Sequence, residues 1–568
     1  MKLLLATLHS RYSHASLALP SLAAVCAGIP DLSCVVREWT IHEQHDRTLR
    51  RLAEEGAVMY GFSCYIWNLE QTLRLVDDLK QLLPHVFIVL GGPEVSFGTF
   101  ETMAAHPAID CVVRGEGEAT FRALAETVAA CGAAPPEELL VTIPGILCRM
   151  GGEIVASPER PPVPELDLLP SPFVAGLVDL AKPLVYVETS RGCPYSCAFC
   201  LSSLDRSVRS HGMERIKCDL AILMEREVAT IKLVDRTFNY DPRRASEIWE
   251  FILRHNRSSL FHFEIAAELL TEEQLTFLST VPRGMFRFEM GVQSGDAETL
   301  ERVGRKSDPG RLLEIVGRLR RETEVVVHLD LVAGLPGEGY DGFLRSLERL
   351  LAVEPHHIQV EPLKVLKGVP MRRIAAHEGY RYAAAPPYKI LSTPWLSFVE
   401  ICRIEDLSRL LDLMVNSGRF PTLLSLLKGE GELASFFDRS ARLMAATGVA
   451  EPRSFLDLCD LITGFLTEIH GGRPFLPDAL SFDFCRNEYP SLTRLPLCFG
   501  GVAGRKEARG PAQRPEGTIP EGARVRRFRR SFLRNYLEFP WGDQPVEFLF
   551  TYVAKQGEGE RVLVEKAG

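Results

Sequence analysis

The first 135 residues alternate short apolar runs with segments whose apolar positions recur every three to four residues. The apolar runs predict strands at 3–8, 34–39, 57–63, 86–91 and 109–114. The periodic segments predict helices at 16–27, 68–83 and 118–130. This spacing places apolar side chains on one helix face. Strands that alternate with helices are typical of a parallel sheet covered on both faces, whose ligands bind beyond the carboxyl ends of the strands.

A second series of strands and helices follows residues 136–183, where prolines interrupt regular structure and predict a linker with a small hairpin near 146–155. Apolar runs between 184 and 384 predict strands at 184–188, 230–235, 262–266, 286–292, 325–332 and 357–363. Periodic segments predict helices at 243–255, 272–278 and 309–321. Such repeated strand–helix units predict a full or partial barrel, with its chemistry at the carboxyl ends of the strands.

Residues 385–568 show a mostly helical pattern. Amphipathic helices are predicted at 404–417, 421–427, 433–447 and 454–468. Apolar stripes of this kind usually pack into a core rather than bind a cofactor. The expected fold class is therefore a multidomain α/β protein with a mostly helical C-terminal domain.

Composition narrows the range of functions. The 568 residues are 46% hydrophobic and 24% charged, which is typical of folded globular proteins. The net charge of −9 gives no global positive field for nucleic acid. The N-terminal apolar run is short and soon meets His9 and Arg11, so it predicts a strand rather than a signal peptide. Without a predicted export signal or membrane span, the 14 cysteines favour a reducing cytoplasm.

The most informative motif is a run of three cysteines. Cys193, Cys197 and Cys200 are spaced C-x3-C-x2-C in the segment CPYSCAFC. Three thiolates on one loop can hold three irons of a [4Fe–4S] cube and leave the fourth iron open. Structural zinc normally takes four ligands, and the nearest further candidate is His211. A ferredoxin-type cluster would also need a fourth cysteine. Three unrelated core cysteines are the remaining alternative, because free cysteine packs as a small apolar residue.

Glycines mark three predicted strand ends of the first domain. The strands end in GFSCYIWN at 61–68, GGPEVS at 91–96 and RGEGE at 114–118. Glycine at a strand end lets a bulky ligand approach the backbone. Tight turns between strands and helices are the structural alternative for each run.

Taken with the cysteine run, these strand ends resemble those of B12-dependent radical S-adenosylmethionine (radical SAM) proteins. The layout resembles a subgroup with a helical C-terminal domain of unknown function (DUF4080-like). The resemblance implies a Rossmann-like cobalamin-binding domain at 1–135, a partial six-stranded radical SAM barrel at 184–384 and a helical domain at 385–568. It also implies three cofactors: a [4Fe–4S] cluster, S-adenosylmethionine and cobalamin. The D-x-H-x-x-G motif, which supplies a cobalt ligand in many cobalamin proteins, is absent.

The resemblance further implies which residues contact each cofactor. The cluster ligands would be Cys193, Cys197 and Cys200. The S-adenosylmethionine contacts would be Phe199, Asp235, Thr237, Glu289, Gln293 and Gly334. The cobalamin contacts would be His14, Ser63, Tyr65, Gly91, Gly92, Glu94, Gly115 and Glu116. Glu264 and Asp330 also resemble strand motifs of the family, and an ordinary role in the barrel core is an equal alternative for them.

The leading functional hypothesis is radical methylation of an unactivated carbon in an unknown substrate. In methylating members of the class, a 5′-deoxyadenosyl radical activates the carbon and methylcobalamin donates the methyl group. One alternative is a B12-assisted rearrangement, cyclisation or oxidation without methyl transfer. Another is RNA modification anchored by the Arg-rich segment 505–534, and a third is a cofactor-binding sensor or carrier. The expected partners are a small-molecule or RNA substrate and an electron donor such as flavodoxin or ferredoxin.

Overall fold

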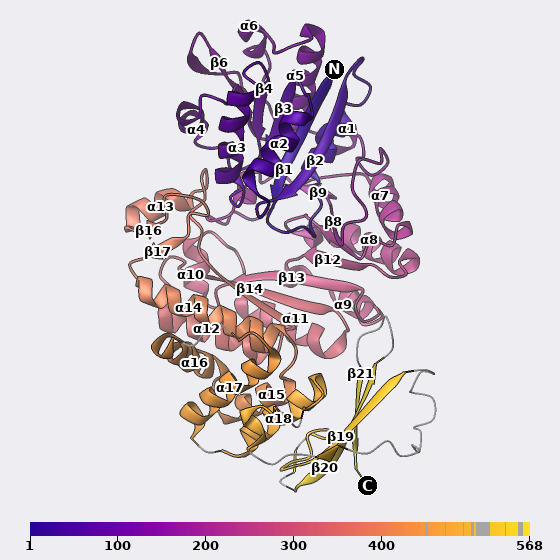
Figure 1. Ribbon diagram of the computed structural model, residues 1–568, viewed down its shortest axis with the longest axis vertical. Coiled ribbons are helices and arrows are strands. Elements are labelled where there is room, and N and C mark those ends of the chain that lie inside the picture. The colour runs from indigo at the N-terminus through magenta and orange to yellow at the C-terminus, as the bar shows by residue number, and fades with distance from the viewer. Residues whose placement is uncertain are drawn as a thin grey trace. The chain divides into compact units, whose positions relative to one another are not determined.

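The computed structural model forms two compact units (Figure 1). It describes residues 1–448, 452–471, 473–491, 494–500, 505–506, 523–539, 541–542, 544–554 and 561–567. The first unit comprises Met1–Gly339 and Pro362–Phe398, and the second comprises Tyr340–Glu361 and Val399–Gly568. Arg509 and Arg514 of the Arg-rich segment lie outside the described residues.

The N-terminal part of the first unit is a seven-stranded sheet of order β2-β1-β3-β4-β5-β6-β7. Its parallel strands are β1 (Lys2–His9), β2 (Ser33–Thr40), β3 (Met59–Ser63), β4 (Phe87–Gly91) and β5 (Cys111–Val113). All five predicted strands are confirmed. The predicted hairpin is also present, as β6 (Ile146–Met150) and β7 (Glu153–Ala156). It extends this sheet in antiparallel fashion instead of belonging to a linker.

Helices cover both faces of this sheet because alternate residues of β1 point to opposite sides. Leu3 and Leu5 pack with the helices of one face, and Leu4 and Ala6 pack with those of the other. The first face carries α1 (Ala18–Val25) and α5 (Glu118–Cys131). The second carries α2 (His45–Glu54), α3 (Leu69–Leu82) and α4 (Thr99–Ala105). The short α6 (Glu137–Leu140) precedes β6.

A second sheet forms a partial barrel of order β15-β14-β13-β12-β11-β8. Its strands are β8 (Leu184–Val187), β11 (Thr230–Leu233), β12 (Leu260–Glu264), β13 (Phe286–Gln293), β14 (Val326–Ala333) and β15 (His357–Pro362). The six predicted strands are confirmed. Helices α7 (Met213–Glu225), α8 (Pro242–His255), α9 (Glu272–Leu278), α10 (Ala297–Arg302), α11 (Pro309–Glu322) and α12 (Tyr340–Ala352) separate them. On the outer face, Trp249 of α8 packs against Phe263 and Phe288.

A short hairpin, β9 (Ser190–Arg191) and β10 (Arg209–Ser210), flanks the cysteine run and is tied to the first sheet by ion pairs. Arg191 pairs with Glu118 at the start of α5, and its Nε lies 2.8 Å from Glu188. Arg209 Nη2 lies 2.6 Å from Glu116. Burial raises the pKa of Glu188 to about 7, although Arg191 opposes this shift. These pairs hold the glycine-rich strand ends next to the cysteine run.

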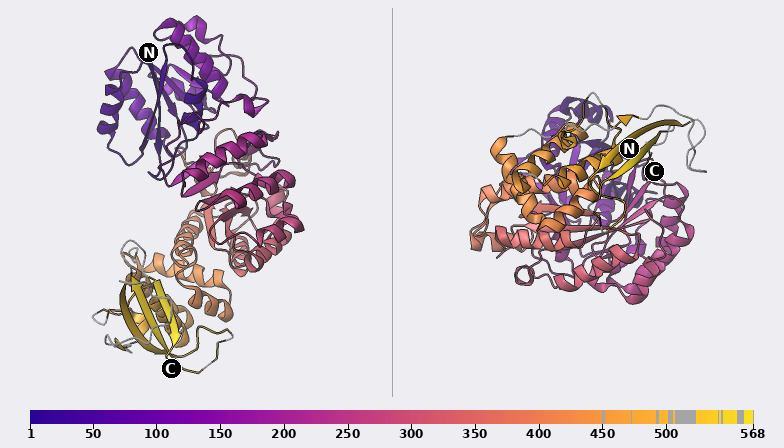
Figure 2. Two further views of the ribbon diagram at one scale, coloured as in Figure 1. Left: turned by 90° about the vertical axis from the view of Figure 1, so that its right-hand side faces the viewer. Right: turned by 90° about the horizontal axis from the view of Figure 1, so that it is seen from below.

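The second unit is confirmed as mostly helical, with α14 (Phe398–Leu411), α15 (Pro421–Glu430), α16 (Leu433–Thr447), α17 (Phe455–His470) and α18 (Phe475–Asn487). It also contains a four-stranded sheet that the sequence pattern did not predict (Figure 2). This sheet consists of β18 (Arg505–Lys506), β19 (Arg524–Phe532), β20 (Val546–Ala554) and β21 (Arg561–Lys566). Phe482 of α18 packs against Phe532 and Phe548 of the sheet.

Part of the Arg-rich segment is therefore strand β19. Arg530 is buried, and its guanidinium lies 4.0 Å from the centre of the Phe499 ring. Arg526 lies over the Tyr489 ring at 4.3 Å. These two arginines pack against aromatic rings of their own unit, as cations do when they stabilise a fold. Within the described ranges, no helix is both long and apolar enough to cross a membrane.

The buried carboxyl group of Asp483 predicts a pH-dependent stability of the second unit. Asp483 accepts a hydrogen bond of 2.9 Å from the backbone N–H of Leu423 at the start of α15, and burial raises its pKa to about 7. Because the folded-state pKa lies above the unfolded-state value, the free energy of unfolding falls as the pH rises from about 4 to about 7. We expect Asp483→Asn to flatten this decline, by at most about 4 kcal/mol.

The measurement is the Tm of the full chain between pH 5 and pH 7.5. Asp341→Asn, at an exposed position of α12 in the same unit, is the matched control and should keep the wild-type slope. A Tm for Asp483→Asn that declines as steeply as that of the wild type contradicts the prediction.

The ion pairs beside the cysteine run predict a second effect. Arg191→Met leaves Glu118 and Glu188 without their shared cation, and should lower the free energy of unfolding by about 3–5 kcal/mol. Arg122→Met removes an exposed pair with Glu126, at 2.9 Å, and should cost less than about 1 kcal/mol. Urea unfolding measures the free energy of unfolding of both variants. Equal losses in the two variants would contradict the prediction that the Arg191 pairs stabilise the fold more than an exposed pair does.

Candidate functional site

The three cysteines lie on a loop between β9 and the 3-10 helix Leu201–Leu204. All three are free thiols, with Cys193 and Cys197 buried and Cys200 partly buried. The backbone of the loop is held at several points. The N–H of Cys193 donates to the carbonyl of Asp205 (3.0 Å), and the N–H of Ala198 donates to the carbonyl of Val303 (2.8 Å). The loop is thus supported by hydrogen bonds from outside it.

Polar side chains accompany two of the sulfur atoms. The Thr237 hydroxyl lies 3.6 Å from Sγ of Cys193, and Arg305 Nη1 donates to Sγ of Cys197 over 3.6 Å. Burial raises the pKa of the Cys197 thiol, and the Arg305 guanidinium opposes that shift. Free thiols on one loop, with hydrogen-bond donors at their sulfurs, fit the ligands of an iron–sulfur cluster. No sequence motif indicated Arg305, because it stands far from the cysteines along the chain.

Asp235 has a different role from the predicted contact with S-adenosylmethionine. Its side chain has no exposed surface, so it cannot touch S-adenosylmethionine directly. Its carboxylate accepts hydrogen bonds from the Thr189 hydroxyl (2.6 Å) and from Ser190. Asp235 therefore positions the segment that leads into the cysteine loop. Phe199 lies on the loop itself, partly exposed, and its contact with S-adenosylmethionine stays a prediction.

The remaining predicted S-adenosylmethionine contacts lie in the barrel. Glu289 Oε2 lies 2.8 Å from Lys232 Nζ and already has a cation. Gln293, at the end of β13, has a left-handed backbone with φ of 68°. Gly334 also has a positive φ of 92°, and a Cβ there would collide with Ile390. Ile390 therefore packs against Gly334, and the contact of Gly334 with S-adenosylmethionine stays a prediction.

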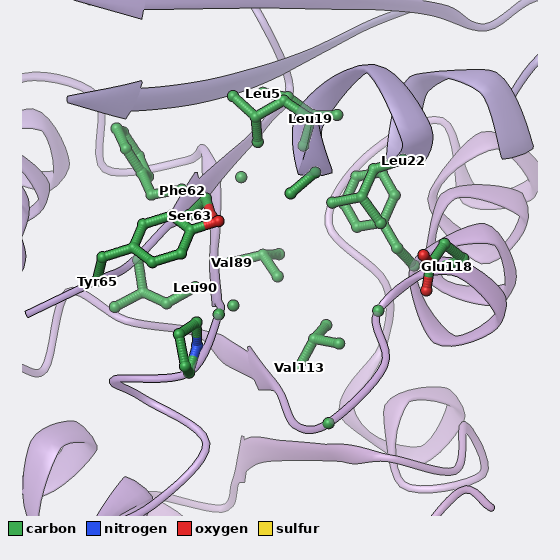
Figure 3. A pocket seen from close by; sticks show the side chains of 18 residues that line it. Leu5, Leu19, Leu22, Phe62, Ser63, Tyr65, Val89, Leu90, Val113 and Glu118 are labelled. Carbon is green, nitrogen blue, oxygen red and sulfur yellow. The ribbon is translucent and has the colours of Figure 1, made fainter. Parts of the chain in front are cut away.

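The glycine-rich strand ends border a cavity of about 190 Å³ (Figure 3). Five predicted cobalamin contacts line it: Ser63, Tyr65, Gly91, Gly92 and Gly115. Sequence reasoning missed its apolar wall, formed by Leu19 and Leu22 of α1 and Phe121 of α5. These residues have the helical periodicity of ordinary core positions, which gives no signal for a ligand. Glycine edges and an apolar wall fit the tail of a large cofactor.

Three other predicted cobalamin contacts do not line this cavity. His14 Nδ1 lies 3.1 Å from the hydroxyl of Tyr186 on β8. Glu94 is buried and accepts a hydrogen bond from Tyr388. Glu116 pairs with Arg209, as described above. Glu116 instead lines a second, larger cavity that adjoins this one. The contacts of these three residues with cobalamin stay predictions.

A second cavity, of about 770 Å³, lies between the glycine-rich strand ends and the cysteine loop. Gly92, Pro93 and Gly115 line both this cavity and the smaller one. Its other side is formed by the residues around the cysteine loop, including Gly192 and Ser202. Space therefore extends from the strand ends of the first sheet to the cysteine loop.

Comparison with family models agrees with this division of the chain. Residues 3–125 match the B12 binding domain, and residues 187–350 match the radical SAM superfamily. Residues 377–507 match the family described as a protein of unknown function, DUF4080. The three predicted parts therefore occur in the predicted order.

Individual relatives point to the same group. The chain is 26% identical to the cobalamin-dependent radical SAM methyltransferase TokK of Streptomyces tokunonensis, over 59% of this chain and 51% of TokK. It is 32% identical to an uncharacterized methyltransferase of Pyrococcus horikoshii, over 50% of this chain and 66% of that protein. The chain thus spans about half to two thirds of the length of these relatives.

A solved structure shows the same fold. The cobalamin-dependent S-adenosylmethionine radical enzyme OxsB, with aqua-cobalamin and S-adenosylmethionine bound, matches with a TM-score of 0.59 at 15% identity, covering 85% of this chain and 78% of OxsB. At this identity the match speaks for the fold alone. Together, the cysteine loop, the glycine-edged cavity and the three matched families identify the chain as a B12-binding radical SAM protein with a DUF4080 region, whose cofactors are a [4Fe–4S] cluster, S-adenosylmethionine and cobalamin.

Proposed function

We propose that this chain is a cobalamin-dependent radical SAM enzyme that transfers a methyl group to an unactivated carbon. The observation that carries the proposal is the shared lining of the two cavities by Gly92, Pro93 and Gly115. A group bound at these strand ends extends toward the cysteine loop, where a radical would be formed. TokK and the Pyrococcus horikoshii relative are both named as methyltransferases, which supports methyl transfer over other outcomes.

Different residues of this chain would hold the cluster and the cobalamin. Cys193, Cys197 and Cys200 would hold the cluster, and the hydroxyl of Thr237 lies next to Cys193. Gly91 and Ser63, at the ends of β4 and β3, would border the tail of cobalamin. When bound, the cluster and S-adenosylmethionine supply a carbon radical, and cobalamin supplies the methyl group. The enclosing protein excludes water and orients these groups.

Methyl transfer can be tested with labelled S-adenosylmethionine. The anaerobically reconstituted chain is incubated with a reductant, a cell extract and S-adenosylmethionine that carries a labelled methyl group. We expect label in cobalamin and in a product that has gained one carbon, together with 5′-deoxyadenosine. Formation of 5′-deoxyadenosine with no labelled product would instead favour rearrangement, cyclisation or oxidation.

Cys197→Ala should abolish the brown absorbance of the cluster and all 5′-deoxyadenosine formation, because three thiolates are needed to hold the cube. Cys218→Ala, which changes an exposed cysteine of α7, should keep both. Iron, sulfide and 5′-deoxyadenosine assays compare the variants. Full iron content in Cys197→Ala would exclude the proposed ligand set.

Gly91→Leu tests the placement of cobalamin. A Cβ at Gly91 meets only ordinary contacts, at 3.8 Å from the Val113 carbonyl oxygen, so a larger side chain fits the backbone and fills the cavity. We expect at least about a tenfold loss of cobalamin affinity, with the iron content unchanged. Gly429→Leu, at an exposed position of α15, is the control and should bind cobalamin normally. Normal cobalamin binding by Gly91→Leu would move the tail to another site.

A further inference from the structure

The inner face of the barrel is charged where barrels are usually filled by branched apolar side chains. Six polar side chains form what we call the barrel cluster: Lys232, His262, Glu264, Glu289, His328 and Asp330. They come from the neighbouring strands β11, β12, β13 and β14. Alternate residues of each strand face inward, while residues such as Phe263 and Phe288 face the outer helices.

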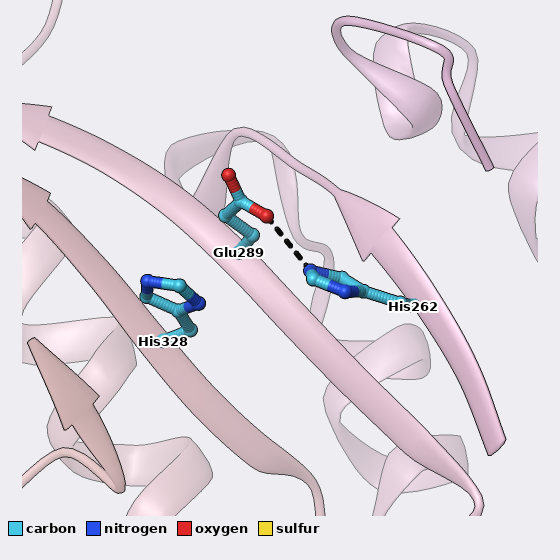
Figure 4. Close-up of side chains that lie close together, drawn as sticks. All are labelled: His262, Glu289 and His328. Carbon is cyan, nitrogen blue, oxygen red and sulfur yellow. Dashed lines mark ion pairs between the residues drawn. The ribbon is translucent and has the colours of Figure 1, made fainter. Parts of the chain in front are cut away.

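Most members of the barrel cluster contact one another. Lys232 Nζ lies 2.8 Å from Glu289 Oε2 and 3.5 Å from Glu264 Oε1. His262 Nε2 lies 2.8 Å from the same oxygen of Glu289 (Figure 4). Lys232 thus serves as the cation for two carboxylates, and His262 adds a further contact to one of them.

Asp330 differs from the other two carboxylates. Its Oδ1 lies 3.1 Å from Nε2 of His328. Among the described residues, no lysine or arginine lies within ion-pair distance of it. Burial raises the pKa of Asp330 to about 6, and the nearby charges of Glu289 and Glu264 add to the shift. A buried carboxylate of this kind is costly unless a partner compensates its charge.

A metal ion does not explain the barrel cluster. His262, Glu289 and His328 do offer ligand atoms within 4.8 Å of one another. However, the ammonium of Lys232 lies 2.8 Å from the oxygen that Glu289 would offer. A divalent cation at that point would meet a like charge at short range in a poorly solvated site. Asp330 is therefore the carboxylate of the barrel cluster that Lys232 does not serve.

Two neighbouring residues link the barrel cluster to the cysteine loop and to the first domain. Arg236 pairs with Glu264 over 3.4 Å and interacts with the charge of Cys200 on the cysteine loop. Tyr186, which interacts with Lys232 and Glu289, contacts His14 of the first domain. The side chains of Glu264, Glu289 and Asp330 retain exposed fractions of 19%, 20% and 21%. A ligand in the barrel can therefore reach them.

We propose that the substrate is a small, hydrophilic molecule that carries a cationic amino group, and that Asp330 binds this group inside the barrel. The inference rests on the proposed radical SAM function. It excludes a hydrocarbon-like lipid, because such a molecule would desolvate Asp330 without giving it a charged partner. Glu264 and His328 border the same space and orient the amine.

The class of substrate is tested by fractionating an extract of the source organism. The extract is divided into a chloroform phase, an aqueous fraction retained on a cation-exchange resin at pH 7, and an aqueous flow-through. Each fraction is added to the reconstituted chain, and 5′-deoxyadenosine and labelled methyl product are measured separately. We expect the retained fraction to stimulate 5′-deoxyadenosine formation most. Stimulation by the chloroform phase or by the flow-through alone overturns the proposal.

This readout separates the two hypotheses. If the retained fraction stimulates 5′-deoxyadenosine formation without methyl transfer, methylation fails and the amine-bearing substrate stands. If the methyl label enters a product found only in the chloroform phase, methylation stands and this inference fails.

Variants of Asp330 test the contact itself. Asp330→Asn should raise the amount of retained fraction needed for half-maximal rate by about tenfold or more, as expected for loss of a hydrogen bond between charged groups. Asp330→Glu keeps the charge and should restore part of that loss. Glu314→Gln, at an exposed position of α11, should behave as the wild type. A wild-type requirement in Asp330→Asn overturns the proposal. If that variant does not fold, Asp330→Glu gives the test, since a longer side chain with the same charge should also change the amount of retained fraction that is needed.

Discussion

The pairing of two arginines with carboxylates of the first domain is the constraint on which the cofactor site depends. Arg191 and Arg209 flank the cysteine loop, while Glu116 and Glu118 follow the last glycine-rich strand end. Separating poorly solvated charges costs free energy. The pairs therefore keep the hairpin beside the cysteine loop in place against the first sheet. Arg191, Arg209 and Glu116 also line the larger cavity, so these pairs form part of its wall. The ion pairs therefore contribute to holding the glycine-rich strand ends beside the cysteine loop.

The strands of both sheets were predictable because their apolar runs are long and bounded by glycine or proline. Helix α2 was not predictable, because only Thr48 and Leu52 of its ten residues are buried. Its other residues show the polar pattern of a solvent-exposed segment. The sheet of the second unit was missed for a related reason. In strand β19, arginines outnumber the apolar residues, and some of these arginines pack against aromatic rings. Their burial depends on partners far away in the sequence.

The residues of the candidate site also differ in how far the sequence alone could predict their roles. The cysteine spacing is local chemistry and can be read from the chain alone. The carboxylates Glu94 and Glu116 stand at strand ends, where a ligand contact and a contact with another domain have the same sequence signature. Only the fold shows that both contact residues outside the first sheet. Asp330 is the opposite case. Its strand position allowed a core role equally well, and only the fold shows that no lysine or arginine of the described ranges pairs with it.

The support of the cysteine loop has a consequence for the assembly of the enzyme. Asp235 holds the segment before the cysteines, and the carbonyl groups of Asp205 and Val303 hold Cys193 and Ala198 of the run itself. All three restraints come from the protein and need no metal ion. The cluster is therefore not the sole restraint on the path of the loop.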